Sequence, residues 1–263
     1  MNLVSIDTLS ASEIREIWSL ADKPHRSLVG TVAWSFEGNG IRTRTTFLQA
    51  FRELGLSHVE LPNLLKTNER VCDLAGYLDP FYAMYVVRES NHDRLREFAS
   101  VSSRPVINAM SCEGHPCEVL SDAYYIDAEF GSIETAKIGL WGPTTNVFKS
   151  WHELAAVFGI KIYHFCDPEF HTRNEHVLFR NTPNEPLDIL ITDGWPSKFS
   201  ELTWSLTLEH LARLGNPRLL PTPPFSIGKE LNFDPISFEG FVCYEQKRVL
   251  LSVQRAIIMR AAR

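Results

Sequence analysis

A cluster of arginines and threonines stands where an apolar segment gives way to a helical pattern. It lies in SFEGNGIRTRTTFLQAF, residues 35–51, and its centre is Arg42, Thr43 and Arg44. The first turn of a helix presents unpaired backbone N–H groups and the positive end of the helix dipole. Guanidinium groups added to such a turn favour a small anion, and these residues alone leave its identity open. The segment therefore predicts recognition of an anionic substrate.

Two residues elsewhere in the chain are expected at the same place. Arg88 directly follows the apolar run AMYVV, and His115 opens a helical pattern after the strand-like run RPVINA. The carboxyl ends of parallel strands meet at one edge of a sheet, where α/β proteins bind their ligands. We therefore expect Arg88 and His115 to converge with Arg42 and Arg44. Three arginines and an imidazole would then meet in one small site.

Short apolar segments alternate with helical patterns along the whole chain, and these elements must position the residues above. The expected strands are residues 28–36, 57–62, 83–88, 104–109, 136–142, 161–166 and 186–194. The expected helices are residues 10–22, 43–55, 68–78, 91–100, 115–126, 145–159, 198–215 and 247–262. This alternation predicts an α/β fold with two domains, each a parallel sheet flanked by helices, and a cleft between them. The expected domains are residues 1–131 and 132–246, and residues 247–263 form a helix that packs back on the first domain.

Composition narrows the classes of partner. The chain has 263 residues and a formal net charge of −6, and its cations are scattered, so we expect no general affinity for nucleic acid or anionic membrane. No apolar run approaches the ~20 residues that span a bilayer. The chain has 5 cysteines without C-x-x-C spacing, which favours reduced thiols. A cytoplasmic protein is the expectation.

Four ordered motifs carry a resemblance to a known family. FEGNGIRTRTTF resembles the F-x-x-x-S-T-R-T-R-x-S-F phosphate motif of the aspartate and ornithine carbamoyltransferases, and GHPCEVLSD resembles their H-P-x-Q-x-L-x-D motif. GPTTNVFKS and TDGWPS are similar to the G-x-x-N-N-V-x-x-S and T-D-x-W-x-S segments of ornithine carbamoyltransferases. The resemblance extends from about Leu9 to Ala256, and its pattern is nearest to the ornithine enzymes.

The resemblance implies a role for each matching residue. In the first domain, which would bind carbamoyl phosphate or a related acyl phosphate, the phosphate-binding places are occupied by Arg42, Thr43, Arg44 and Arg88. The catalytic places are occupied by Arg88, by His115, which would bond the carbamoyl oxygen, and by Glu118. In the second domain, the places that hold an amino-acid-like acceptor are occupied by Asn146, Asp193 and Ser197. The resemblance further implies a homotrimer, a role in amino-acid metabolism and no cofactor.

The donor side departs from the family pattern at three positions. Gly40 and Ile41 replace the serine and threonine of S-T-R-T-R, which removes two hydroxyl groups that each contribute ~1 kcal/mol or more to phosphate binding. We therefore expect weaker phosphate binding. Glu118 replaces the family glutamine, and a carboxylate near a phosphate favours a transferred group with more donors or positive charge, for example an amidino-like group.

The acceptor side departs further. Pro221 and Thr222 stand where the ornithine enzymes have the histidine and cysteine of H-C-L-P, and Leu250 aligns nearest to their terminal arginine. The loop NLLKTNER, residues 63–70, is short relative to the family loop that lends residues to a neighbouring subunit. We therefore expect an acceptor other than ornithine. The alternative is a non-catalytic relative that binds a phosphorylated metabolite as a sensor or partner subunit.

Simpler structural interpretations stay open for the same residues. Arg42 and Arg44 are also compatible with a helix surface, and Glu118 with a solvated helix position. Helix capping is an alternative role for His115, Asn146, Asp193 and Ser197. Asp193 would then cap the helix expected to begin near Lys198. The segment HFCDPEFHTRNEH, residues 164–176, contains metal-ligand types, but its spacing fits no closed four-ligand pattern, and we expect no metal.

Overall fold

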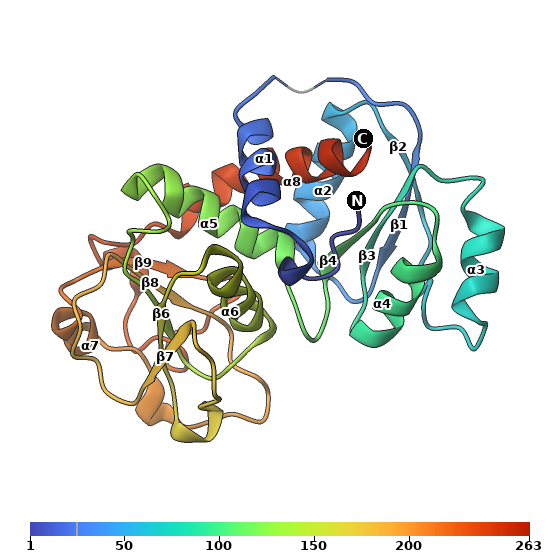
Figure 1. Cartoon of the computed structure of the whole chain (residues 1–263). Coiled ribbons are helices and arrows are strands. Elements are labelled where there is room, and N and C mark those ends of the chain that lie inside the picture. Colours follow the sequence, from blue (N-terminus) through green and yellow to red (C-terminus); the bar gives the residue numbers. More distant parts are fainter. Residues whose placement is uncertain (25) are drawn as a thin grey trace. The chain divides into compact units, whose positions relative to one another are not determined.

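The computed structural model of the protein describes residues 1–24 and 26–263. It divides into two α/β units, the first made of Met1–Tyr124 with Arg248–Arg263 and the second of Tyr125–Lys247. The chain leaves the first unit within helix α5 (Pro116–Phe130) and returns to it within helix α8 (Cys243–Ala261), as Figure 1 shows. The sequence-based boundary, Gly131, is the residue directly after α5.

The first unit is built on a sheet of parallel strands. Its strands are β1 (Thr31–Phe36), β2 (Ser57–Glu60), β3 (Met84–Arg88) and β4 (Val106–Met110). Their spatial order is β2-β1-β3-β4. The chain runs outward from β1 to β2 and then crosses back to place β3 on the other side of β1. The strand order therefore reverses between β1 and β3, which is where open α/β sheets bind ligands.

Helices cover both faces of this sheet (Figure 1). They are α1 (Ala11–Ala21), α2 (Ile41–Glu53), α3 (Val71–Leu78) and α4 (His92–Val101), preceded by a 3₁₀ turn at Ile6–Thr8. Helix α1 begins at a capping box between Ser10 and Glu13. Helix α8 is tied to α1 and α2 by ion pairs, Arg260 with Glu16 at 2.7 Å and Arg255 with Glu53 at 2.5 Å.

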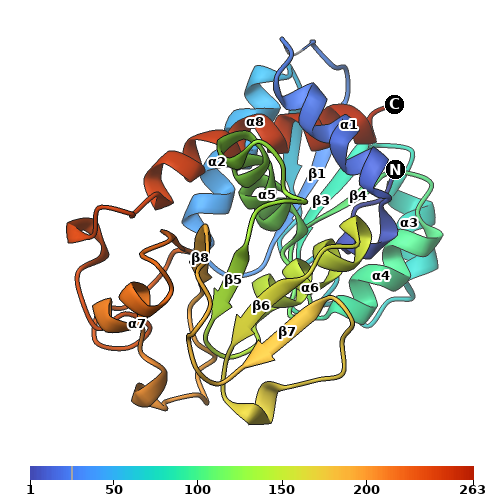
Figure 2. The same ribbon diagram turned by 60° about the vertical axis from the view of Figure 1, so that its left-hand side comes forward.

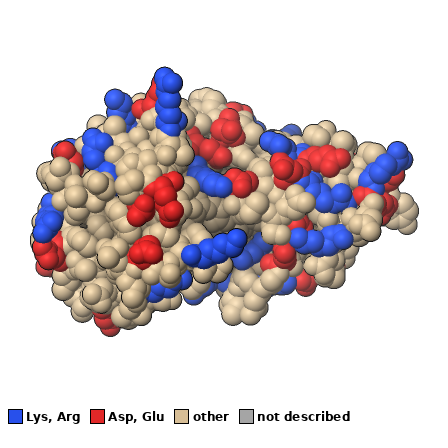
Figure 3. Space-filling model, turned by 90° about the horizontal axis from the view of Figure 1, so that it is seen from below, with Lys and Arg blue, Asp and Glu red and all other residues tan. Residues whose placement is uncertain are grey.

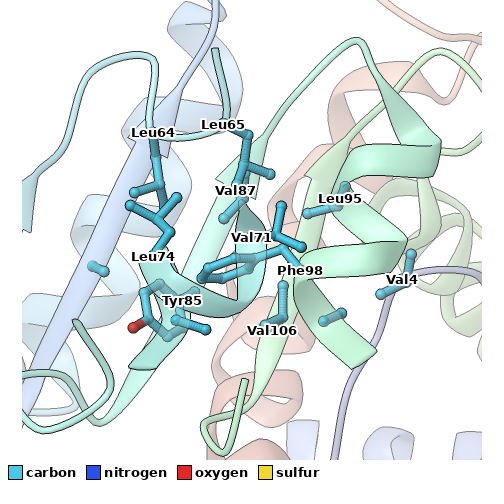
Figure 4. Close-up of a cluster of buried hydrophobic side chains, with 13 residues drawn as sticks. Val4, Leu64, Leu65, Val71, Leu74, Tyr85, Val87, Leu95, Phe98 and Val106 are labelled. Atoms are coloured by element: carbon cyan, nitrogen blue, oxygen red, sulfur yellow. The ribbon is translucent and has the colours of Figure 1, made fainter. Parts of the chain in front are cut away.

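Large apolar side chains fill the space between the sheet and its helices. On one face, residues of α3 and α4 pack on β3 and β4, and Figure 4 shows Phe98 among Tyr85, Val87 and Val106. On the other face, the ring of Trp34 in β1 contacts Phe47 and Phe51 of α2. Burial on both faces explains why these strands are nearly continuous apolar runs.

The second unit has its own parallel sheet (Figure 2). Its strands are β5 (Ile138–Trp141), β6 (Ile162–Phe165), β7 (Val177–Arg180), β8 (Ile189–Thr192) and β9 (Arg218–Pro221), in the order β7-β6-β5-β8-β9. The remaining elements are helices α6 (Asn146–Phe158) and α7 (Leu208–Arg213) and 3₁₀ turns at Pro168–Phe170, Leu202–Trp204 and Pro235–Ser237. The strand order here reverses between β5 and β8.

The structure corrects the sequence-based elements in this unit. Strands β7 and β9 were not expected, because runs of four residues such as VLFR and RLLP carry too little pattern. The helix expected over residues 198–215 is wrong. Leu206 is instead extended and forms a bridge with Leu231, and Thr207 then caps the short helix α7. Tertiary pairing at Leu206 therefore overrides the local helical pattern.

Charge and hydropathy of the described residues agree with the composition. On the face shown in Figure 3, lysines and arginines are interspersed with aspartates and glutamates and form no broad basic stripe. Within residues 1–24 and 26–263, no helix combines the length and the apolar character needed to cross a lipid bilayer.

Candidate active site

The end of β1 meets the end of β3 at the switch point of the first sheet. Phe36, the last residue of β1, is paired with Arg88, the last residue of β3. The chain then turns into α2, whose N-cap is Gly40 in the left-handed conformation, with φ 35° and ψ 42°. The N-terminal N–H groups of α2 and the side chain of Arg88 therefore lie at the same edge of the sheet.

The ring of Phe36 brings two guanidinium groups together. The Cζ atom of Arg88 lies 5.3 Å from the ring centre, and the Cζ atom of Arg44 lies 4.8 Å from it. Both distances are within the range of cation–π contacts. Burial lowers the pKa of Arg88, and the nearby carboxylate of Glu37 opposes this shift. Two cations on one ring beside a helix N-terminus form an arrangement that favours an anion.

The other residues of this turn differ in exposure. The side chain of Arg42 is exposed, whereas Thr43 is buried. Arg44 also donates a hydrogen bond of 2.8 Å from Nη2 to Glu60 in the edge strand β2. The structure thus brings Arg44 and Arg88 together at one ring, and it places Arg42 on the same helical turn facing solvent.

A polar network that sequence reasoning missed fixes the strand ends around Arg88. The amide of Glu37 donates to the carbonyl of Arg88 at 3.0 Å, and the amide of Ser90 donates to the Glu37 carboxylate at 2.6 Å. This second bond is the main reason that the pKa of Glu37 is lowered. Lys66 Nζ bonds the buried carboxylate of Glu89 at 2.5 Å. In the sequence, an acidic residue directly follows each of the two paired strands, Glu37 after β1 and Glu89 after β3, and this pattern could have indicated the network.

The loop that carries Lys66 is held against its own unit. Three backbone carbonyls of this loop accept hydrogen bonds from the guanidinium of Arg94, those of Leu65 at 2.6 Å, Thr67 at 2.8 Å and Glu69 at 2.7 Å. Leu65 itself belongs to the core cluster, and Figure 4 shows it pointing toward that cluster. The loop at residues 63–70 is therefore anchored by contacts within its own unit.

His115 and Glu118 approach the same edge from the neighbouring strand. Met110 at the end of β4 is paired with Arg88, and His115 directly precedes α5, which begins at Pro116. Glu118 in the first turn of α5 is buried, which is inconsistent with a solvated helix position. Burial, and secondarily the Glu118 carboxylate, raises the pKa of the Cys117 thiol.

The three acceptor-side residues lie at the switch point of the second sheet. Asn146 is the first residue of α6, directly beyond the loop after β5, and Asp193 directly follows β8. Ser197 is exposed in a turn shortly after Asp193. Helix α6 is capped by the hydroxyl of Thr145, not by Asn146. Because residue 198 does not begin a helix, Asp193 and Ser197 do not act as caps there.

A tryptophan and a glutamate that sequence reasoning did not single out organise these loops. A Cβ atom added to Gly142, after β5, would lie 3.0 Å from Trp195 Nε1, so the indole packs directly on this glycine. The buried carboxylate of Glu230 accepts from the amide of Trp195 at 2.9 Å and from the amide of Ser226 at 2.8 Å. Glu230 therefore joins the loop that carries Asp193 to the segment LLPTPPFSIGKEL.

The histidines of the second unit are engaged with protein groups. His164 Nε2 lies 2.9 Å from the carbonyl of Gly142, and His164 Nδ1 lies 3.1 Å from His152 Nε2. Since a carbonyl only accepts, Nε2 of His164 donates and its Nδ1 accepts from His152. Burial lowers the pKa of His152 to about 4 and that of His164 to about 3. Among the described residues, no group of three or more metal-ligating side chains is placed to hold an ion.

Known proteins resemble this chain in sequence and in fold. An ornithine carbamoyltransferase of Methanocorpusculum labreanum is 32% identical over 174 residues, 61% of this chain and 57% of that protein. An ornithine carbamoyltransferase of Acinetobacter baumannii is 27% identical over 273 residues, 94% of this chain and 89% of that protein. The crystal structure of ornithine carbamoyltransferase from Thermus thermophilus superposes with a TM-score of 0.89 at 22% identity, covering 100% of this chain and 99% of that chain.

The two parallel sheets and the arginines at the first switch point define a two-unit α/β protein with cations clustered at a ligand-binding edge. The sequence pattern of the family described as "Aspartate/ornithine carbamoyltransferase, carbamoyl-P binding domain" matches residues 1–128. This match over the first 128 residues, together with the relatives, supports a member of the aspartate/ornithine carbamoyltransferase family, and the relatives are transferase enzymes.

Proposed function

We propose that this chain transfers a carbamoyl or closely related group from an acyl phosphate to the amine of an amino-acid-like acceptor. The observation that carries the proposal is the pair of guanidinium groups, Arg44 and Arg88, on the ring of Phe36 beside the N-terminus of α2. A phosphate group is the anion best suited to such a site, because it accepts from helix N–H groups and from guanidinium groups at once.

The proposed reaction is an acyl transfer. The uncharged amine attacks the carbonyl carbon of the acyl phosphate, and a C–N bond forms. The C–O bond to phosphate then breaks, the phosphate leaves with the electron pair, and the amine loses a proton. Arg88, with Arg42, Thr43 and Arg44, would hold the phosphate, and His115 would donate to the carbonyl oxygen as negative charge develops there.

The substituent of the transferred group would face Glu118. This side chain is buried in the first turn of α5, where the family has glutamine. A carboxylate accepts hydrogen bonds but donates none while it is ionised. It therefore suits a transferred group whose nitrogen atoms carry several N–H donors, which includes carbamoyl and amidino-like groups.

For the acceptor, we propose an amino acid or a related amine other than ornithine. Asp193 would pair with an ammonium group of the acceptor, and Asn146 and Ser197 would hydrogen-bond its polar atoms. Pro221 and Thr222 support a different acceptor, because they cannot supply the imidazole and the thiol that the ornithine enzymes have there.

A non-catalytic binding protein is the second candidate. The observation that favours it is Leu250, which aligns nearest to the family's terminal arginine and is buried in α8 at 4% exposure. A buried aliphatic side chain cannot polarise a carbonyl group. Under this alternative the cations at Phe36 would bind a phosphorylated metabolite without transfer.

Binding and transfer are tested separately. We expect calorimetry to detect carbamoyl phosphate binding to the wild-type protein and its loss in Arg88→Ala. Arg96→Ala is the matched control, because Arg96 is an exposed arginine paired with Asp93 on α4. Unchanged affinity in Arg88→Ala would contradict the site. Mass spectrometry of mixtures with carbamoyl phosphate and a panel of amino acids then detects transfer, and binding without any product would support the second candidate.

We also propose, by resemblance, a cytoplasmic homotrimer that acts in amino-acid metabolism. Sedimentation equilibrium of the purified protein measures the oligomeric state directly.

A further inference from the structure

Gly40 has no room for a side chain. Its φ of 35° lies in the left-handed region, which disfavours other residues. A Cβ atom added there would lie 2.2 Å from Phe36 Cε1 and 2.7 Å from Arg88 Nη1. Both distances are below any ordinary van der Waals contact. The space beside Cα of Gly40 is therefore occupied by the guanidinium of Arg88 and the ring of Phe36.

Phe36 is held firmly enough to act as a support. It is buried at 4% exposure and stacks on Trp34, with ring centres 4.7 Å apart and an angle of 25°. Its backbone is paired with that of Arg88 across β1 and β3. The ring therefore cannot move away from Arg88 without disturbing the centre of the sheet.

We propose that Gly40 and Phe36 are positioning residues that seat the guanidinium of Arg88 against the N-terminus of α2. The proposal rests on the function proposed above and concerns its phosphate-binding subsite. Most relatives are expected to have a serine at position 40, whose hydroxyl would face the phosphate. In this chain the ring of Phe36 and the guanidinium of Arg88 occupy that place. The subsite thereby loses a neutral donor and keeps a charged one, which suits the dianionic phosphate of an acyl phosphate.

This arrangement predicts that restoring the family serine at position 40 weakens phosphate binding, whereas the missing hydroxyl alone would predict that it strengthens binding. If the hydroxyl is what the site lacks, Gly40→Ser strengthens phosphate binding and Gly40→Ala does not. If Gly40 makes room for Arg88, both substitutions displace the guanidinium and weaken binding to a similar extent. The loss of one charge-assisted hydrogen bond corresponds to about tenfold in affinity or more.

The experiment measures the affinity of inorganic phosphate and of carbamoyl phosphate by calorimetry. We expect Gly40→Ala and Gly40→Ser each to weaken both ligands about tenfold relative to the wild type. Gly38→Ala is the matched control, because Gly38 also has positive φ, at 70°, but a Cβ atom there would have no neighbour within 4 Å. Phe36→Leu keeps an apolar side chain without the aromatic ring, and we expect weaker binding here as well.

A double-mutant cycle separates positioning from a general loss of structure. In an Arg88→Ala background, Gly40→Ala should cause no further loss of phosphate affinity, because the group that it displaces is absent. Tighter binding in Gly40→Ser, or equal further losses in both backgrounds, would overturn the inference while leaving the proposed function intact. A wild-type protein that binds neither ligand would overturn the proposed function and the inference with it.

Discussion

Replacing Glu230 by alanine should loosen the acceptor-side loop without affecting the phosphate site. The carboxylate of Glu230 is 4% exposed and accepts hydrogen bonds from the amides of Trp195 and Ser226. These two bonds join the loop after β8 to the segment before Glu230. Without the carboxylate, the buried amide of Trp195 would have to find water or stay unsatisfied.

The size of the effect follows from the surroundings of the two amides. A hydrogen bond to a charged group contributes about 1.5–3 kcal/mol, and the bond to Trp195 is buried, so it should fall near the upper end. Ser226 is exposed and its amide can be rehydrated, so its bond should contribute about 1 kcal/mol or less. The ion pair with Lys229, at 3.7 Å on an exposed side chain, adds little. Glu230→Ala should therefore destabilise the second unit by about 3 kcal/mol, and Glu230→Gln by about half of this, because the amide keeps one acceptor oxygen.

Thermal unfolding followed by circular dichroism measures this loss. For a unit of this size, 1 kcal/mol corresponds to about 4 °C in Tm, so Glu230→Ala should melt about 12 °C below the wild type. Glu239→Ala, an exposed glutamate in the same unit, is the control. Phosphate affinity should stay unchanged, since Arg44 and Arg88 belong to the first unit. A Tm within 1 °C or so of the control would refute the assignment of Glu230 as the link between the loops.

Two further predictions concern titratable groups. Glu118→Gln should change the rate of carbamoyl transfer to a panel of amines; an increase would mean that the native donor is not carbamoyl phosphate, and no change would argue that Glu118 does not meet the transferred group. The second concerns His152 and His164, whose folded pKa values of about 4 and about 3 lie below the ~6.5 of an unfolded histidine. Between these values the unfolded state binds more protons, so stability is lost as pH falls from about 6.5 toward 4, by up to ~1.4 kcal/mol per pH unit for each histidine. Urea midpoints at pH 7 and pH 5 should differ less in His152→Asn than in the wild type, and an equal difference would contradict this reading.

The sequence predicted the first unit well because its signals are local. Ser10 and Glu13 form a capping box at the start of α1, and Gly55, at the end of the helix expected over residues 43–55, has a left-handed φ of 72° just after α2. The second unit was harder to predict, both at the short strand β7 and after residue 195. There the chain follows contacts between distant segments, such as the bridge between Leu206 and Leu231, which no local periodicity reports.

The sequence predicted which site residues lie at strand ends, but it did not predict the order of the strands in each sheet. The alternation of elements indicated that Arg88 and Asp193 lie at the carboxyl ends of parallel strands, and both do, Arg88 as the last residue of β3 and Asp193 directly after β8. It could not indicate that β1 lies between β2 and β3, or that β5 lies between β6 and β8. These two facts identify the switch points, the positions along each sheet edge where open α/β sheets bind ligands.

Position 40 shows why a residue-by-residue comparison with the family motif is incomplete, because it leaves out the contacts that each residue makes in the structure. Aligned with the family motif, Gly40 and Ile41 amount to two missing hydroxyl groups and a weaker phosphate site. In the structure, Ile41 is 64% exposed, whereas the space at Gly40 is taken by the ring of Phe36 and by a guanidinium from a strand 48 positions away in sequence (88 − 40). The charged donor that remains at that point counts for more than the neutral donor that is lost, because a charge-assisted hydrogen bond is about twice as strong as a neutral one. Gly40 and Arg88 therefore act as one unit, and a substitution at either position should be read through its effect on the other.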